Sequence, residues 1–261
     1  MARNEFTPYD IRIRICQAIL SEIQHFSYKT SLRGLGVLNG NDRISGESWF
    51  LQKALKLPDH AVVFDVGANI GLYSTSILKY FPSAVVFAFE PHPLNYSKSL
   101  AIQNINPVRA AIGASHGKTV IFDYEKMDGT AHASLFRGVI ENIHGSKSIS
   151  HRVPCVTLDR FAKEKKIKEV KFLKIDTEGN ELNVLLGAAQ LLKEKRIETI
   201  QFEFNEMNTV SRVFFRDFQE LLPDHAFYRL LPAGLLPLEK NSPMTNEIFG
   251  YQNIIATLAK W

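Results

Sequence analysis

The pattern of hydrophobic and polar positions divides the chain near residue 61. Before that point, isoleucines recur at helical spacing from residue 11 to residue 23 behind Thr7 and Pro8, which together form a helix start signal. The alternation IRIRI within this stretch also fits a short strand, but the longer pattern favours a helix. Ser45 is expected to cap a second helix that ends near residue 57. Residues 1–58 are therefore predicted to form a helical extension packed on the core.

From residue 61 onward, short apolar runs alternate with segments of helical period. This βαβ order predicts an α/β domain over residues 59–261, with a mostly parallel sheet and right-handed crossovers. The last two strands are expected to close one sheet edge as an antiparallel pair. The predicted strands are 61–66, 84–90, 108–112, 118–124, 151–157, 170–175, 199–204, 227–231 and 253–257, and the predicted helices are 72–81, 95–104, 180–194 and 210–222.

The segment between residues 126 and 150 does not follow this alternation. It is polar, contains glycine and lacks a clear period. A loop of this length inside a compact domain is usually functional, often as a lid or a substrate-contacting segment.

Composition narrows the class of protein only a little. Hydrophobic residues make up 45% and charged residues 22% of the chain, as in ordinary globular proteins. The net charge of +4 tolerates an anionic ligand but does not indicate a nucleic-acid partner. Two cysteines outside any CxxC pattern, no signal peptide and no membrane-spanning run predict a cytoplasmic protein without a disulfide framework. The pattern leaves the oligomeric state open.

The segment DVGANIG follows the first predicted strand of the α/β domain. Gly67 and Gly71 allow a sharp turn and a close approach of the backbone to a ligand at the start of the next helix. Dinucleotide sites use GxGxxG at this place, but here Asn69 replaces the middle glycine. Asp65, just before the glycines, suits a cationic ligand better than a pyrophosphate. The motif therefore favours S-adenosylmethionine over NAD as the cofactor.

A second acidic residue, Glu90, ends the next predicted strand, 25 residues after Asp65. A carboxylate at this position can accept hydrogen bonds from both ribose hydroxyls of a nucleoside. The alternative is that Glu90 is an ordinary helix N-terminal acid before Pro91. Asp65 and Glu90 at the ends of successive strands are more specific together than either is alone.

Four segments of the chain resemble the FkbM family of S-adenosylmethionine-dependent O-methyltransferases. They are FDVGANIGLYS, AFEPHPLNY, VTLDRF and LKIDTEGNELNVLLGA, and the resemblance extends from about Glu47 to the C-terminal NIIAT. It implies a Rossmann-like class I fold with a seven-stranded sheet and with the cofactor at the carboxyl edge of its first strands. It also implies methyl transfer to a hydroxyl group, with a sugar of a glycan or secondary metabolite as the expected small-molecule acceptor.

The acceptor side is expected at the ends of the two strands that follow the central loop. Asp176 and Glu178 come directly after one strand, and Glu203 ends the next, with Asn205 two residues on. Asp176, Glu203 and Asn205 are candidate oxygen ligands for a divalent ion such as Mg²⁺, which some sugar O-methyltransferases resembling this family use. Alternatively, Asp176 is a catalytic base or cofactor-binding group assisted by Glu203, or simply a turn carboxylate that opens the next helix.

The central loop contributes two further candidates, His132 and Ser134. His132 is a candidate catalytic base, although a lone loop histidine is more often a solvated surface residue. The resemblance places Ser134 near the cofactor. No HExxH zinc motif and no GxSxG elbow are present in the sequence. The competing functions are an NAD-type oxidoreductase and a non-catalytic module that binds S-adenosylmethionine.

Two structural expectations complete the picture. Asp159 is expected to cap a helix over residues 160–166, whose lysines then form a solvated face or, in a minority interpretation, a track for an anionic glycan. A set of aromatic side chains at burial-compatible spacing is expected in the core: Phe202, Phe204, Phe214, Phe215 and Phe218.

Overall fold

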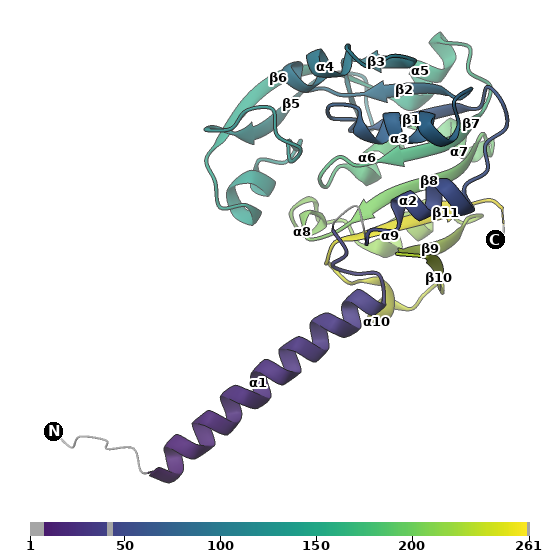
Figure 1. The fold of residues 1–261 in the computed structure, drawn as a ribbon. Helices are drawn as coiled ribbons and strands as arrows, with labels where there is room; N and C mark the ends of the chain where they lie inside the picture. Colours follow the sequence, from purple (N-terminus) through teal and green to yellow (C-terminus); the bar gives the residue numbers. More distant parts are fainter. Residues whose placement is uncertain (1–7, 41–43, 260–261) are drawn as a thin grey trace.

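A central β-sheet carries helices on both faces in the computed structural model, which describes residues 8–40 and 44–259 (Figure 1). The order of its eight strands is β10-β9-β11-β8-β7-β1-β2-β3. The five strands from β8 to β3 are parallel, whereas β11 runs antiparallel to both β8 and β9. These strands are β1 (Val62–Val66), β2 (Val85–Phe89), β3 (Ile105–Val108), β7 (Val170–Ile175), β8 (Ile197–Phe204), β9 (Ala226–Leu231), β10 (Gly234–Leu238) and β11 (Gln252–Thr257).

This sheet confirms the predicted Rossmann-like α/β class and the antiparallel closing pair. It has one strand more than the seven expected, because β10 folds back on β9 as a hairpin. The helices are α1 (Pro8–Gly34), α2 (Glu47–Trp49), α3 (Leu72–Tyr80), α4 (Pro93–Ser99), α5 (Leu158–Glu164), α6 (Glu181–Leu186), α7 (Ala189–Lys193), α8 (Met207–Ser211), α9 (Phe215–Leu221) and α10 (Pro243–Asn246), with π-helical turns η1 (Phe50–Ala54) and η2 (Val139–Ile143).

A small second sheet builds a lobe beside the main one. It consists of β4 (Ala111–Ile112), β6 (Ser148–Val156) and β5 (Gly117–Tyr124), in that order. The single strand expected over residues 108–112 is therefore wrong: the chain leaves the main sheet after β3 and pairs with β6 through β4. The predicted irregular segment 126–150 connects β5 to β6 and contains η2.

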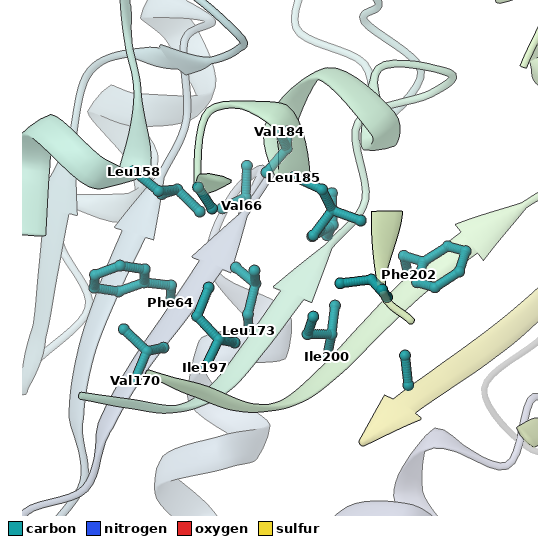
Figure 2. Packing of buried hydrophobic residues seen from close by; sticks show 14 of the residues in the cluster. Phe64, Val66, Leu158, Val170, Leu173, Val184, Leu185, Ile197, Ile200 and Phe202 are labelled. Atoms are coloured by element: carbon teal, nitrogen blue, oxygen red, sulfur yellow. The ribbon is translucent and has the colours of Figure 1, made fainter. Parts of the chain in front are cut away.

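Side chains alternate between the two faces of the main sheet, so each face has its own core. On one face, Phe64 and Leu173 pack with buried residues of α5, α6, α7 and α9 (Figure 2). On the other face, Val63 and Phe172 pack with Phe50 of η1 and with α3. Because Asp65 and Lys174 lie at paired register positions on this second face, their charged groups face α2 and α3.

The N-terminal extension differs from the packing expected for residues 1–58. The 27-residue helix α1 projects from the body, and the described side chains from residue 12 to residue 31 are exposed (Figure 1). Among the described residues of the extension, buried apolar side chains begin with Leu32 and Val37 and continue with Phe50, Leu51 and Leu55. Thr7 lies outside the described residues, and no helix among those described is both long and apolar enough to cross a membrane.

Local details also differ from the sequence pattern. Ser45 Oγ accepts a hydrogen bond from Glu47 N, the first residue of α2, at 3.4 Å, although Gly46 and not Ser45 occupies the N-cap position. Asp159 accepts hydrogen bonds from Gln190 N and Leu191 N, both at 2.9 Å, and so caps α7, whereas Thr157 caps α5.

The predicted helices over 180–194 and 210–222 are each broken in two. In the second of them, Arg212 adopts a left-handed conformation between α8 and α9. Of the five aromatic residues expected in the core, four are buried and Phe214 is 43% exposed.

Candidate functional site

The turn between β1 and α3 is built on residues with positive φ. Gly67 has φ 83°, Asn69 φ 50° and Gly71 φ 84°, so three residues within five adopt the left-handed region. The backbone nitrogens of Gly67 and Ala68 both donate to Phe89 O at 3.0 Å, which ties the turn to the end of β2. Gly71 is the N-cap of α3 and uses no side chain. The turn is thus a fixed backbone surface at the carboxyl edge of the sheet.

Asp65 lies beneath this turn and points away from the pocket described below. Its carboxylate is buried and accepts a hydrogen bond from Ser74 Oγ at 2.5 Å. Burial raises the pKa of Asp65 to about 6, against the lowering effect of the Ser74 bond. Asp65 therefore supports the turn from the α3 side, and direct contact with a cofactor stays a prediction.

Glu90, at the end of β2, joins the turn to the start of α4. Its two carboxylate oxygens accept from Asn69 N at 2.8 Å and from His92 N at 2.7 Å. Burial raises the pKa of Glu90 to about 7, while the two backbone bonds favour the charged form. Each oxygen keeps a further lone pair, so the carboxylate can accept additional hydrogen bonds from a ligand.

A pocket opens between this turn, the strand β4 and the central loop. Of the residues predicted to bind the cofactor, Gly67, Asn69, Glu90 and Asp176 line it, whereas Asp65, Gly71 and Ser134 do not. Two amide oxygens, Asn69 Oδ1 and Asn95 Oδ1, are buried and have no hydrogen-bond partner among the described residues. The other lining residues include apolar side chains such as Ile112, Ile121 and Leu135. Such a combination of apolar walls and a few convergent polar groups is typical of a small-molecule site.

A buried lysine, Lys174, lies close to Asp176 at the end of β7. Lys174 Nζ is 3.4 Å from Asp176 Oδ2 and 3.6 Å from Glu47 Oε1, and its side chain is 3% exposed. Although burial opposes its charge, these carboxylates raise the pKa of Lys174 well above its usual value. Glu47 comes from α2, so the N-terminal extension contributes a charge to this site.

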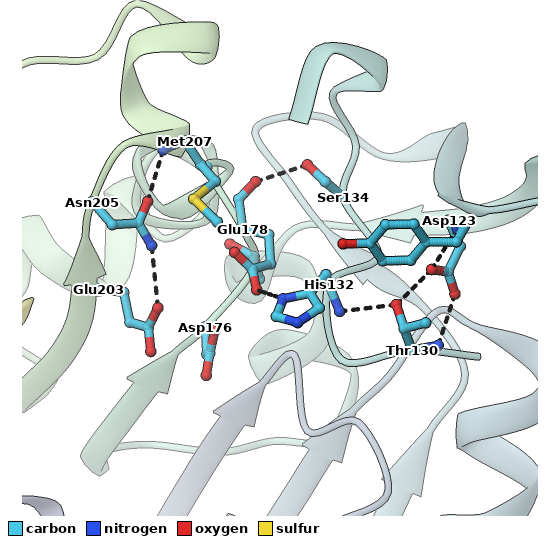
Figure 3. A network of polar contacts seen from close by, with 12 residues as sticks. Asp123, Thr130, His132, Ser134, Asp176, Glu178, Glu203, Asn205 and Met207 are labelled. Carbon is cyan, nitrogen blue, oxygen red and sulfur yellow. Dashed lines mark hydrogen bonds and ion pairs between the residues drawn. The ribbon is translucent and has the colours of Figure 1, made fainter. Parts of the chain in front are cut away.

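Glu203 and Asn205 lie at the end of β8, on the same edge of the sheet as Asp176. Figure 3 shows Glu203 beside Asp176. Burial first, and the charge of Asp176 next, raise the pKa of Glu203 well above its usual value. Asn205 Nδ2 donates to Glu203 Oε2 at 3.3 Å, and its Oδ1 accepts from Met207 N at 3.0 Å. The predicted metal ligands thus lie on one edge, but the amide oxygen of Asn205 already fixes the start of α8.

The central loop brings His132 to the same edge. Its Nδ1 lies 3.2 Å from Glu178 Oε1, and no described residue bonds its other ring nitrogen (Figure 3). The bond to Glu178 raises the pKa of His132, and the ring is about half exposed. Ser134 Oγ donates to Glu178 O at 2.7 Å, which holds the loop on the turn after β7. A carboxylate that orients a partly exposed imidazole is the arrangement of a general base.

The turn after β7 is itself organised by Glu181. Its Oε1 accepts from Thr177 N at 3.0 Å, Thr177 Oγ1 at 2.9 Å and Gly179 N at 3.1 Å. The other oxygen, Oε2, is buried and finds no partner in the part of the chain that the structure describes, and burial raises the pKa of Glu181 to about 7. This carboxylate therefore shapes the segment that carries Asp176 and Glu178.

The raised pKa predicts a pH-dependent contribution to stability. Because the folded pKa exceeds the usual 4.5, the contribution of Glu181 is complete below pH 4.5 and is lost as pH rises through about 7. The loss is up to about 3 kcal/mol. Glu181→Gln keeps the accepting oxygen and removes the ionisation, so its free energy of unfolding should fall less between pH 5 and pH 8 than that of the wild type. Urea denaturation at both pH values measures this, and parallel pH dependence in the two proteins would contradict it.

Comparison with known proteins gives the family. The model of the methyltransferase FkbM domain matches residues 65–230. The chain belongs to the FkbM methyltransferase family. The matched residues include the β1–α3 turn, the central loop and the β7 and β8 edge.

Curated relatives of this FkbM methyltransferase are distant. It is 25% identical over 151 residues to Methyltransferase 1 of Beauveria bassiana, covering 50% of this chain and 59% of that protein. It is also 25% identical over 159 residues to methyltransferase sdnD of Sordaria araneosa, covering 50% and 61%. The chain thus spans about three fifths of the length of these relatives.

Among solved structures, an FkbM methyltransferase from Methylobacillus flagellatus KT is similar with a TM-score of 0.49 and 14% identity, covering 80% of this chain and 47% of that one. The plantazolicin methyltransferase BpumL in complex with SAH gives a TM-score of 0.43 and 11% identity, with coverage of 82% and 83%.

The sequence did not predict the contacts of three residues of the site. Lys174 and Glu178 lie within the LKIDTEGNE segment, but nothing in the pattern pairs them with Glu47 or His132. Asn95 lies in AFEPHPLNY, five residues after Glu90, and this position was the available signal for a pocket residue. Such contacts depend on how distant segments fold together.

Proposed function

We propose that this FkbM methyltransferase transfers a methyl group to a hydroxyl, in a sugar of a glycan or secondary metabolite, with His132 as the general base. The observation that carries the proposal is the His132–Glu178 pair at the carboxyl edge of the sheet, next to the pocket lined by Gly67 and Glu90. Sugar hydroxyls are weak nucleophiles, so a positioned base that removes the hydroxyl proton assists the reaction.

The close backbone of the turn and the unused polar atoms of the pocket support binding of S-adenosylmethionine there. A side chain at Gly67 would fill the turn, since a Cβ there would lie 1.7 Å from Asp176 O. The unpartnered oxygens of Asn69 and Asn95 are available to amino or hydroxyl donors of a nucleoside. Glu90 would accept from the ribose hydroxyls, and when bound, the cofactor supplies a methyl group already activated on a sulfonium.

The acceptor would lie between His132 and the carboxylates of the edge. With Nδ1 bonded to Glu178, the neutral imidazole has its lone pair on Nε2, which is the atom that would take the proton of the attacking hydroxyl. Asp176 is a weaker candidate for this role, because its carboxylate is already paired with the Lys174 ammonium at 3.4 Å. Glu203, whose pKa is raised by burial, can hold a proton and donate a hydrogen bond to the acceptor.

A Mg²⁺ site formed by Asp176, Glu203 and Asn205 is the alternative for activating the hydroxyl. We favour metal-free catalysis, because Asn205 Oδ1 is engaged by Met207 N and burial favours the protonated form of Glu203. A protonated carboxylic acid is a poor ligand for a hard cation.

Binding and turnover experiments together test this proposal. The purified full chain should bind S-adenosylhomocysteine in calorimetry at micromolar affinity and show no comparable affinity for NAD. It should then methylate members of a panel of sugars and other hydroxyl compounds, and activity should survive thorough chelation. NAD binding in place of S-adenosylhomocysteine would overturn the cofactor assignment. Loss of activity on chelation, restored by Mg²⁺, would replace the metal-free mechanism by the metal-assisted one. Methylation confined to amines, thiols or carbon atoms would refute O-methylation.

A further inference from the structure

Beside the proposed cofactor pocket, two histidines meet on one carboxylate. His92 Nε2 and His151 Nε2 both lie 2.8 Å from Asp128 Oδ1. His92, at the N-cap of α4, is fully buried, His151 lies on β6, and Asp128 belongs to the central loop. The proposed mechanism uses none of these three side chains. Their convergence from three separate segments therefore calls for another role.

The hydrogen bonds of His92 indicate what kind of cluster this is. The three ligand-type atoms lie within 4.8 Å of one another, a spacing at which a metal ion is conceivable. However, Leu94 N donates to His92 Nδ1 at 3.3 Å, so the lone pair of the neutral ring is on Nδ1 and its proton is on Nε2. A metal at Nε2 would need the opposite tautomer. The cluster is thus a pair of N–H donors sharing one carboxylate oxygen.

The loop held by Asp128 forms one wall of the pocket. Thr130, Ala131, Ala133 and Leu135 line it directly. Buried Asp123 on β5 accepts from Gly129 N at 2.8 Å and from Thr130 N at 2.9 Å, which fixes the loop just after Asp128.

The same histidine also reaches the opposite wall. Its backbone nitrogen donates to Glu90 Oε1 at 2.7 Å, while its ring holds Asp128. Asn95, one turn into α4, donates from Nδ2 to Thr130 O at 3.0 Å. The segment from Glu90 to Asn95 therefore connects the proposed ribose carboxylate to the loop across the pocket.

We propose that Asp128 is a positioning residue for cofactor binding, which holds residues 128–135 against the pocket through its hydrogen bonds with His92 and His151. The proposal rests on the proposed location of the cofactor. Asp128 itself does not line the pocket; it acts through the loop. Without its carboxylate, the loop loses its hydrogen bonds to His151 of β6 and to the His92 ring, and Asn95 still holds Thr130 O. The cofactor must then supply part of the order of the loop on binding.

The test compares full-length variants at Asp128 in S-adenosylhomocysteine calorimetry. Asp128→Ala should raise Kd about tenfold. Asp128→Asn retains an oxygen that accepts from both histidines and should stay within about threefold of the wild type. Lys126→Ala, an exposed change in the same loop, is the matched control and should not alter Kd. Hydrogen exchange of residues 128–135 in the free protein should be faster in Asp128→Ala alone, with unchanged protection of β1 and β7.

Glu90→Ala separates this proposal from the one on which it rests. If Glu90→Ala weakens binding and Asp128→Ala does not, the positioning role is wrong and the pocket assignment stands. If Glu90→Ala binds like the wild type, the pocket itself is misplaced and both proposals fall. Equal weakening in Asp128→Ala and Asp128→Asn would overturn the hydrogen-bond role. Stoichiometric retention of Zn²⁺ by the wild type, lost in Asp128→Ala, would replace it by a metal site.

Discussion

Replacing His132 by Gln should lower kcat between about a hundredfold and ten-thousandfold, the usual range for loss of a general base. Glutamine can still bond Glu178, so the loop remains attached, but its amide has no atom that takes a proton near neutral pH. Because His132 is not among the residues lining the proposed cofactor pocket, Kd for S-adenosylhomocysteine should change by less than about threefold. Initial rates with the acceptor found in the hydroxyl panel, together with calorimetry, measure both quantities. Near-normal kcat would remove His132 from the mechanism.

Glu178 gives the matched control for the same prediction. The bond to Glu178 raises the pKa of His132 above its usual 6.5, and the imidazole acts as a base only when neutral. Activity should therefore fall as pH drops through that raised value. Glu178→Gln keeps an acceptor for Nδ1 but removes the negative charge, so the acid limb of the kcat profile should move to lower pH. A limb that stays in place, or moves upward, would contradict the pairing as the source of the shift.

The sheet and the turn between β1 and α3 were largely predictable from the sequence, because they depend on local patterns. Continuous apolar runs give buried parallel strands, and a turn that needs three positive φ angles leaves glycine and asparagine at fixed spacing. These local patterns are why the sequence predicts Gly67, Asn69 and Glu90 as cofactor-binding residues, and all three line the pocket.

The contacts on which the proposed chemistry depends were not predictable in this way. His132 and Glu178 are 46 residues apart, and their bond depends on how the lobe of β5 and β6 folds against the main sheet. His151 likewise reaches Asp128 from 23 residues away. No period or local propensity encodes such pairs, which tertiary packing alone brings together.

The N-terminal segment is a second case in which the sequence predicts the element but not its contacts. Its helical period predicts α1 correctly, but period alone says nothing of what a helix packs against. The N-terminal extension contacts the site through Glu47 of α2, whose carboxylate lies 3.6 Å from the Lys174 ammonium. The pairing of Glu47 with buried Lys174 of β7 cannot be predicted before the relative positions of the strand and the helix are known.

Gly67→Ala should abolish S-adenosylhomocysteine binding and destabilise the protein by about 2–5 kcal/mol, the sum expected for a left-handed alanine and an overpacked contact. Gly67 has φ 83°, and an added Cβ would lie 1.7 Å from Asp176 O and 2.7 Å from Asp176 C. Both neighbours are backbone atoms, so no rotamer change relieves the clash. The turn and the end of β7 must separate, which displaces the two elements that carry Asn69 and Asp176.

Gly234→Ala is the matched control for this change, because nothing lies within 4 Å of the position of its Cβ. It should leave Kd unaltered and shift the free energy of unfolding by less than about 1 kcal/mol. Urea denaturation and calorimetry on both variants measure the contrast. If Gly67→Ala retained wild-type stability and affinity, the close packing of this turn against β7 would not be what shapes the cofactor site. Loss of binding with intact stability would instead show that the strain is relieved locally and that the backbone surface itself is what the cofactor requires.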